Sequence, residues 1–502
     1  MIALIVVVTV LGVCSGQFLP GKKQTEKIAA HFGGPKPLPL IGNLLEFNTD
    51  IPGIFEKGIH LIKKHGPNLF LWGFLNENIL ILGDTKLVEK VLLAKQTQKS
   101  LLYTFLNSWL RTGLLLSSGE KWFQRRRIIT PTFHFKILEQ FVTVFNREAE
   151  TMVDLMRKHV GGKEFDVYSY VTLMALDSVC EASMGTTVNA QHDPDNRYVR
   201  NVKRMSVLFL LRVVSPLAGR PEIYTVVHPN AYEQRKIVRE LHEFTDNVIA
   251  NRRKQLQSEQ TLDINRNVEG VYTKQKMTFL DLLLNVTIDG NPLSDVDIRE
   301  EVDTFMFEGH DTTTSGISFT LWHLAKYQDV QQKLYEEIDR VLGKDKANAD
   351  LTNLQIQELE YLDMVVKESL RLIPPVPIIG RTLVEDMEMN GVTIPAGTQI
   401  SIKIYNIHRN PKIWENPDEF IPERFSKTNE SKRGPYDFIP FSAGSRNCIG
   451  QRYAMMELKV TIIKLIASFK VLPGDSMDKL RFKTDLVIRP DNGIPIKLVE
   501  RV

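Results

Sequence analysis

The chain has 502 residues, and 63 lysines and arginines against 60 aspartates and glutamates leave a net charge of +3 at pH 7. With 43% hydrophobic and 25% charged residues it is composed like an ordinary globular protein, which excludes a disordered tail, a collagen and a small disulfide-stapled domain. A charge so close to neutral provides no strong field to attract nucleic acid, so we expect no nucleic-acid partner.

The first 20 residues form an apolar segment. The stretch from Ile2 to Val13 is apolar except for Thr9, and lysines follow at positions 22, 23 and 27. We expect residues 1–20 to act as a membrane anchor, because the lysines would hold its end in the cytoplasm. A cleaved signal peptide is the alternative, although the positive start of such a peptide is missing.

Residues 21–43 are expected to form a hinge, because Gly33-Gly34-Pro35-Lys36-Pro37 cannot continue a helix. Residues 44–502 contain no linker and no internal repeat, so they are expected to form a single domain. The one long polar stretch, from Gln255 to Lys276, is flanked by helical patterns and predicts an internal loop.

The hydrophobic pattern predicts mostly helices. Short strands are predicted between Asn68 and Gly83, and helical periodicity dominates from about Thr85 onward. β-like sequence returns from Met387 to Ile404. The sequence therefore predicts a mainly α fold with a minor β region.

One long helix is predicted from Ser294 to Lys326, a stretch of 33 residues without proline. It starts with Ser294-x-x-Asp297, an N-terminal capping pattern. In its middle stands Glu308-Gly309-His310-Asp311-Thr312-Thr313, where a helix-weakening glycine lies among side chains that compete for backbone hydrogen bonds. Such a polar notch is costly in a core helix, and taken alone it indicates a solvated turn.

The three cysteines, Cys14, Cys180 and Cys448, are too few and too far apart for a disulfide framework or a zinc site with paired ligands. Cys448 lies in the segment Phe-Ser-Ala-Gly-Ser-Arg-Asn-Cys-Ile-Gly, residues 441–450, directly before a helical run. A helix N-terminus and nearby backbone N–H groups stabilise a thiolate. The glycines let the backbone approach a flat group closely.

The spacing Phe-x-x-Gly-x-Arg-x-Cys-x-Gly resembles the haem-ligand loop of the cytochrome P-450 monooxygenases, with Cys448 in the place of the axial thiolate on the iron. The resemblance extends in chain order from Gly33 to the C-terminus. It implies the cytochrome P-450 fold, in which a long central helix lies over haem b and the cysteine loop lies beneath it. Within this loop it implies haem contacts for Phe441, Gly444, Arg446 and Gly450.

Other positions match that family as well. Trp122 and Arg126 resemble the Trp-x-x-x-Arg pair that reaches the haem propionates, and Arg381 and Arg446 match further propionate-binding positions. Arginine suits this role because its planar donors bind carboxylates in a bidentate manner.

A second set of charged residues resembles a structural element of the family. Glu368 and Arg371 lie three residues apart, and Arg424 follows in Pro-Glu-Arg-Phe. The resemblance implies a buried network of Glu368, Arg371 and Arg424 that holds the proximal side of the haem, with a structural and not a catalytic role.

The polar notch is similar to the family's oxygen-activation site. There Gly309 would open space for dioxygen, Asp311 would relay protons and Thr312 would orient them. The resemblance thus implies a monooxygenase that uses O2 and supplied electrons to hydroxylate C–H bonds, the haem carrying the chemistry.

Glu308 indicates one branch of the superfamily, because the segment Phe-Glu-Gly-His-Asp-Thr-Thr resembles the corresponding segment of the family-four members of insects. In many of these the glutamate forms an ester with a haem methyl group, which we carry over to Glu308 as a hypothesis; a Glu308 turned toward solvent is the alternative. The implied substrates are lipophilic: fatty acids, insect hormones or xenobiotics including insecticides. Candidate pocket residues by position are Phe105, Leu114, Ile378 and Ile379.

The resemblance also implies partners and a location. Electrons would come from a flavin-containing NADPH reductase, or from a cytochrome such as cytochrome b5, at the cytosolic face of the endoplasmic reticulum membrane. Two alternatives remain open: a haem-thiolate isomerase or dehydratase, which commonly lacks the acid and the threonine, and a non-enzymatic haem carrier. The expected basic docking face consists of Lys121, Arg125, Lys432, Arg433 and Arg452.

Overall fold

The computed structural model describes residues 22–501 except residues 40, 74–77, 95–96, 134, 216–220, 267–277 and 289. The expected anchor or signal segment, residues 1–20, lies outside the described residues. Among the residues that are described, no helix combines the length and the apolar character needed to cross a membrane.

Helices dominate, and the strands are short. The helices are α2 (Lys22–Phe32), α3 (Ile51–His65), α4 (Thr85–Leu93), α5 (Asn107–Leu110), α6 (Gly119–Ile129), α7 (Phe135–Met156), α8 (Val167–Ala182), α9 (Arg197–Val213), α10 (Pro221–Val227), α11 (Pro229–Arg266), α12 (Phe279–Asn285), α13 (Asp295–Lys326), α14 (Gln328–Leu342), α15 (Asn353–Glu358), α16 (Glu360–Leu372), α17 (Ile404–Ile407), α18 (Lys427–Glu430) and α19 (Gln451–Ser468). The strands are β1 (Leu69–Leu71), β2 (Ile79–Leu82), β3 (Thr97–Lys99), β4 (Phe165–Asp166), β5 (Thr287–Ile288), β6 (Asn291–Pro292), β7 (Ile379–Leu383), β8 (Met387–Met389), β9 (Val392–Ile394), β10 (Gln399–Ile402), β11 (Phe469–Pro473), β12 (Phe482–Thr484), β13 (Ile488–Pro490) and β14 (Pro495–Glu500).

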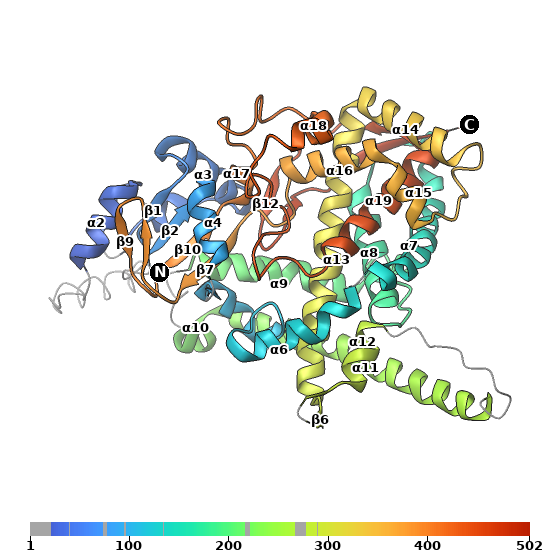
Figure 1. Ribbon diagram of the computed structural model, residues 1–502, viewed down its shortest axis with the longest axis horizontal. Coiled ribbons are helices and arrows are strands. Elements are labelled where there is room, and N and C mark those ends of the chain that lie inside the picture. The colour runs from blue at the N-terminus through green and yellow to red at the C-terminus, as the bar shows by residue number, and fades with distance from the viewer. Residues whose placement is uncertain are drawn as a thin grey trace.

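A five-stranded sheet on one side of the molecule joins segments that are far apart in sequence (Figure 1). Its order is β1-β2-β10-β7-β3; β2 and β10 are parallel, and the other neighbours are antiparallel. The run Ile-Leu-Ile-Leu of β2 suits a strand that is covered on both faces. Ile400 and Ile402 of β10 pack with apolar residues of α2 and α4 in one core cluster.

The long helix α13 runs through the middle of the molecule and packs against α8, α16 and α19 (Figure 1). The Ser294 side chain accepts a hydrogen bond from the Asp297 backbone N–H, which confirms the predicted cap. The Thr312 hydroxyl donates to the Glu308 carbonyl at 2.8 Å, and the next two threonines also bond the preceding turn. The notch is therefore regular helix, in which the three threonine hydroxyls bond the preceding turn, and not a solvated turn.

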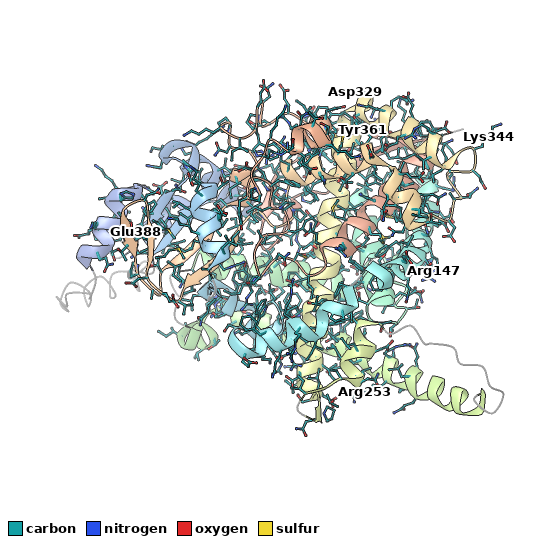
Figure 2. All side chains as sticks on the ribbon, in the orientation of Figure 1. Arg147, Arg253, Asp329, Lys344, Tyr361 and Glu388 are labelled. Carbon is teal, nitrogen blue, oxygen red and sulfur yellow. The ribbon has the colours of Figure 1, made fainter. Side chains whose placement is uncertain are left out.

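Side chains fill the interior around α13, where one large apolar cluster joins α7, α8, α13, α16 and α19. Figure 2 shows labelled charged side chains of both signs, such as Arg147, Arg253, Lys344 and Glu388, spread around the periphery. This arrangement agrees with the mixed charge of the sequence.

Three expectations about local structure differ from the observed elements. The segment 21–43, expected as a hinge, contains helix α2 at Lys22–Phe32, whose Ile28 and Phe32 are buried against the sheet. This amphipathic stretch precedes Gly33, where the glycine- and proline-rich part begins. The polar stretch 255–276 is predicted to be a loop, but α11 continues to Arg266, and residues 267–277 lie outside the described part. The second β region starts at Ile379, before Met387.

Candidate functional site

A cavity of about 540 Å³ lies between α13, the sheet and the loop that precedes α19. Cys448 lines it from the loop, and Glu308 and Thr312 line it from α13. The fold thus brings the two most informative sequence segments, residues 308–313 and 441–450, to the same space.

The loop before α19 is closed by its own backbone. The Cys448 N–H donates to the Phe441 carbonyl at 2.9 Å, and the Asn447 N–H donates to the Gly444 carbonyl at 3.2 Å. Ser442 and Gly444 both have positive φ, of 61° and 74°. This tight turn presents the Cys448 side chain to the cavity just before the first turn of α19.

The surroundings of the Cys448 sulfur disfavour a free thiolate. Burial, together with the negative charge of Glu308, raises the pKa of this thiol to about 12, although the Gly450 backbone N–H and Arg126 act in the opposite direction. At neutral pH the sulfur therefore keeps its proton unless a cation binds it and displaces the proton. A haem iron at the sulfur would supply that cation.

Gly444 is required by its surroundings as well as by its φ. A Cβ at this position would lie 2.1 Å from the Leu92 carbonyl oxygen, which is backbone and cannot move aside. We expect Gly444→Ala to lower the haem content of the purified protein strongly and to cost more than the about 1–2 kcal/mol of the φ alone. Haem-to-protein ratio and urea unfolding measure the two effects.

The control for this prediction is Gly343→Ala. Gly343 has the same φ of +74°, but a Cβ added there would meet no atom within 4 Å, so only the backbone cost applies. Equal haem loss and equal destabilisation in the two variants would contradict the steric argument.

Four cationic side chains gather at one part of this cavity. Lys99, Arg126 and Arg446 line it. Arg381 does not line it and is buried behind this wall, where it stands opposite Lys99 in the pairing of β3 with β7. None of the four forms an ion pair with a carboxylate of the described residues.

The hydrogen bonds of these arginines go to neutral groups. Arg126 donates to the Asn447 carbonyl and side-chain oxygens, both at 2.8 Å, and Arg446 donates to the Ser117 carbonyl at 2.7 Å. Arg381 donates to the Gly380 carbonyl at 2.9 Å. Their charges are therefore not neutralised within the described part of the chain.

These cations destabilise one another. Burial, with repulsion from Arg381 and Arg126, lowers the pKa of Arg446 to about 10. Burial and Arg381 lower the pKa of Lys99 to about 7, and Glu308 acts in the opposite direction. The Arg446 guanidinium lies 4.1 Å from the centre of the Trp122 ring, which orients it. A cluster of this kind fits an anionic group with two carboxylates, such as the propionates of a haem.

Glu308 and Thr312 face the cavity from α13. Burial raises the pKa of Glu308 to about 7, although Lys99 and Arg126 act in the opposite direction. Glu308 is therefore turned into the cavity and not toward bulk solvent.

Gly309 also lines the cavity, but the space beside it has another occupant. A Cβ added to Gly309 would lie 2.5 Å from a methyl group of Val179 on α8. The glycine therefore permits the close packing of α8 on α13. The resemblance to the oxygen-activation site does not predict this packing role.

Asp311 lies on another side of α13 and is not among the residues that line the cavity. It is 1% exposed and forms an ion pair of 2.5 Å with Arg489. The Arg489 guanidinium also contacts Asp485 at 3.2 Å and the Ser206 hydroxyl at 3.1 Å. Asp485 does line the cavity, so Asp311 connects to it through Arg489 and Asp485.

The structure brings Glu368, Arg371 and Arg424 together. Arg371 donates to both carboxylate oxygens of Glu368 at 2.7 and 2.8 Å, and Arg424 donates to Glu368 at 3.3 Å. Glu368 and Arg371 are fully buried. Arg371 also donates to three backbone carbonyls between residues 408 and 419, so the pair fixes the chain that leads toward the cysteine loop.

Comparison with known proteins decides the family. The family model described as Cytochrome P450 matches residues 32–498. The chain belongs to the cytochrome P450 family. It is 43% identical to cytochrome P450 4d2 of Drosophila melanogaster over 93% of each chain. It is 42% identical to cytochrome P450 4V2 of Mus musculus, over 92% of this chain and 88% of the relative, and 41% identical to cytochrome P450 4d8 of Drosophila melanogaster, over 90% and 98%.

These matches confirm the resemblance drawn from the sequence, both to the superfamily and to its family-four members, and the helical structure with small sheets is the cytochrome P450 fold. As a cytochrome P450 the protein is a haem-thiolate monooxygenase, an oxidoreductase whose cofactor is a haem held by a cysteine thiolate.

Two sets of residues expected from position alone require correction in this P450. Leu114, Ile378 and Ile379 line the cavity, but Phe105 does not, because it is buried beneath the Arg212 guanidinium. Arg125 cannot belong to an exposed docking face, because it is 4% exposed and paired with Asp297.

The remaining members of the expected docking face differ in exposure. Lys121 is tied to Glu300, and Arg433 packs on the Trp414 ring at 4.8 Å, whereas Lys432 and Arg452 are exposed. Sequence spacing could not separate buried from exposed cations here.

Three residues of the site carry no signal in the sequence: Lys99, Asp485 and Arg489. Lys99 reaches the cations because β3 pairs with β7, where it stands opposite Arg381. Asp485 lies between β12 and β13, Arg489 lies in β13, and neither belongs to a sequence motif. Only the strand pairing and the packing of the C-terminal segment on α13 reveal them.

Proposed function

We propose that Cys448 is the axial ligand of the haem and that Arg126, Arg381 and Arg446, with Trp122, hold its propionates. The observation that carries this proposal is the unpaired cation cluster beside a cavity that also contains the Cys448 thiol. Phe441, Gly444 and Gly450 shape the backbone around the sulfur. The Glu368, Arg371 and Arg424 network keeps the proximal side in place.

The bound haem supplies the activation of O2 for insertion into a C–H bond. In this mechanism the apolar side chains of α13 and the sheet bind the substrate and exclude water. The Thr312 hydroxyl, already bonded to the Glu308 carbonyl, holds a proton at the cavity wall. Asp311, the residue before Thr312 on α13, acts as the proton source. Arg489 keeps its own proton and holds Asp311 beside Asp485, which lines the cavity.

We propose lipophilic substrates, fatty acids above all, with electrons from a flavin-containing NADPH reductase and cytochrome b5 as a second donor. The holoenzyme is to be incubated with NADPH, a reductase and a series of saturated fatty acids. Hydroxylated product formed only with reductase supports the proposal. Rearrangement of a lipid peroxide without reductase, and no NADPH-dependent product, would contradict it and favour an isomerase.

We also propose that the haem is attached covalently through Glu308. The ester would join a Glu308 carboxylate oxygen to a haem methyl carbon in place of one methyl hydrogen. One O2 would be consumed, with two electrons from the reductase and two protons, and both of its oxygen atoms would leave as water. Acid denaturation and solvent extraction are expected to leave haem on the wild-type protein after turnover and to remove it completely from Glu308→Gln. Glu301→Gln, a buried glutamate of α13 that does not line the cavity, is the control and should retain haem.

Complete extraction of haem from the wild-type protein after turnover would show that Glu308 makes no ester. The raised pKa of Glu308 would then reflect only its burial, which outweighs the opposing charge of Lys99.

We propose further that the catalytic domain sits on the cytosolic face of the endoplasmic reticulum membrane, with residues 1–20 as its anchor. Two glycosylation sequons, Asn285-Val-Thr and Asn429-Glu-Ser, report on this. Asn285 is exposed. A protein from cells that carries no glycan and sediments with membranes is expected; a glycosylated, secreted product would contradict the location.

A further inference from the structure

The cavity extends away from Cys448 toward the sheet and helix α3, and this end contains one lysine that the proposed chemistry does not use. Ile79 and Ile81 of β2 and Ser401 of β10 line it, and so does Lys403, directly after β10. Lys403 follows the last residue of β10, and its backbone N–H donates to the Leu82 carbonyl of β2 at 3.1 Å, so it lies at the end of the sheet. In Figure 1 this sheet, with α3 and α17 beside it, lies to one side of α13.

The surroundings of Lys403 are apolar. Phe55 and Ile59 of α3 and Ile79 and Ile81 of β2 line the same end of the cavity. Tyr405, two residues beyond Lys403, packs edge-on against Phe55 with ring centres 5.1 Å apart, so this part of the chain lies against α3.

The Lys403 ammonium makes no hydrogen bond and no ion pair within the part of the chain that the structure describes. Burial alone lowers its pKa to about 8, and no charged neighbour contributes. The cations of the haem end behave differently, since the charge of Arg381 lowers the pKa of both Lys99 and Arg446. Lys403 is therefore set apart from the cluster assigned to the propionates.

A lone ammonium in an apolar channel is costly, because it gives up hydration without gaining a partner. The cost is offset when an anion enters the same channel, since a charge-assisted hydrogen bond in low dielectric is strong. An anion that reaches Lys403 while its hydrocarbon chain follows the apolar cavity toward Cys448 must carry its charge at one end.

We infer that Lys403 binds the carboxylate of a long-chain fatty acid and thereby points the opposite, methyl-bearing end of the chain toward the haem. This inference rests on the proposed function, because it assumes that the cavity receives an oxidisable lipid. It adds the residue that holds the substrate, Lys403, and a preference for monocarboxylates over neutral lipids of the same length.

The test compares laurate with dodecanol, which has the same chain but no charge. Both are titrated into the holoenzyme and followed by the haem absorption band, with equilibrium dialysis of labelled ligand as a second readout. Lys403→Met is expected to weaken laurate binding by about 10- to 100-fold and to leave dodecanol binding within about twofold. Lys403→Arg, which keeps the charge, should bind laurate nearly as well as the wild type.

Lys412→Met is the matched control, because Lys412 is an exposed lysine near Lys403 in sequence and should bind both ligands like the wild type. Lys403→Met should also be at least as stable as the wild type in urea, because it removes an unpaired, half-buried cation from an apolar part of the cavity. Equal weakening of laurate and dodecanol, or no weakening of either, would overturn the inference.

Failure of the inference and failure of the proposed function are distinguishable. A wild-type enzyme that hydroxylates dodecanol with reductase but binds laurate no better than dodecanol retains the proposed function and loses the role of Lys403. A wild-type enzyme that binds neither ligand and gives no reductase-dependent product loses both.

Discussion

Replacing Glu368 with alanine is expected to lower the free energy of unfolding by about 3–5 kcal/mol and to prevent stable haem incorporation. Glu368 is fully buried and accepts hydrogen bonds from Arg371, from Arg424 and from the Ile421 backbone N–H at 2.8 Å. Its loss leaves the Arg371 guanidinium buried without a counter-ion. Urea unfolding and the haem-to-protein ratio are the measurements.

Glu360→Ala provides the matched control on the same helix, α16. The Glu360 carboxylate pairs with Lys427 on the surface, with side chains 61% and 87% exposed, and such pairs contribute about 0–1 kcal/mol. If Glu368→Ala proved no more destabilising than Glu360→Ala, the buried network would not be what holds the segment before the cysteine loop.

Asp311→Asn is expected to lower kcat for reductase-dependent hydroxylation by about 10²–10⁴-fold, the usual contribution of a positioned proton donor. The amide keeps a hydrogen bond to Arg489 but cannot supply a proton. Haem content and laurate binding should change little, because Asp311 does not line the cavity. Product formation, NADPH consumption and the solvent isotope effect on kcat are to be measured together.

Asp303→Asn is the control, because it shows how much kcat falls when any buried carboxylate of α13 is replaced by an amide. Asp303 is fully buried two turns before Asp311 and does not line the cavity. A kcat for Asp311→Asn equal to that of Asp303→Asn, with an unchanged isotope effect, would show that the Asp311–Arg489 pair is structural only.

Sequence alone identifies those site residues that lie together in one short motif. The loop 441–450 and the notch 308–313 each carry their residues at fixed spacing, and the Ser294 cap marks the start of the helix that holds the notch. Backbone geometry then brings Cys448, Glu308 and Thr312 to one cavity.

The residues that sequence could not reveal depend on long-range packing. Lys99 joins the cation cluster only because β3 pairs with β7, and Arg489 meets Asp311 only because the C-terminal segment packs on α13. The environment of Gly309 is likewise set by α8, since Val179 occupies the space beside it. Arg125 and Lys121 are close in sequence but differ in exposure, which spacing alone does not determine.

The carbon-monoxide difference spectrum of the reduced, purified protein tests most directly whether Cys448 binds the haem iron. Thiolate ligation moves the haem band to long wavelength, whereas histidine ligation does not. We predict a shifted band in the wild-type protein and its disappearance in Cys448→His with haem still bound. An unshifted band in folded, haem-loaded wild-type protein would mean that Cys448 is not a thiolate ligand and would contradict the proposed site.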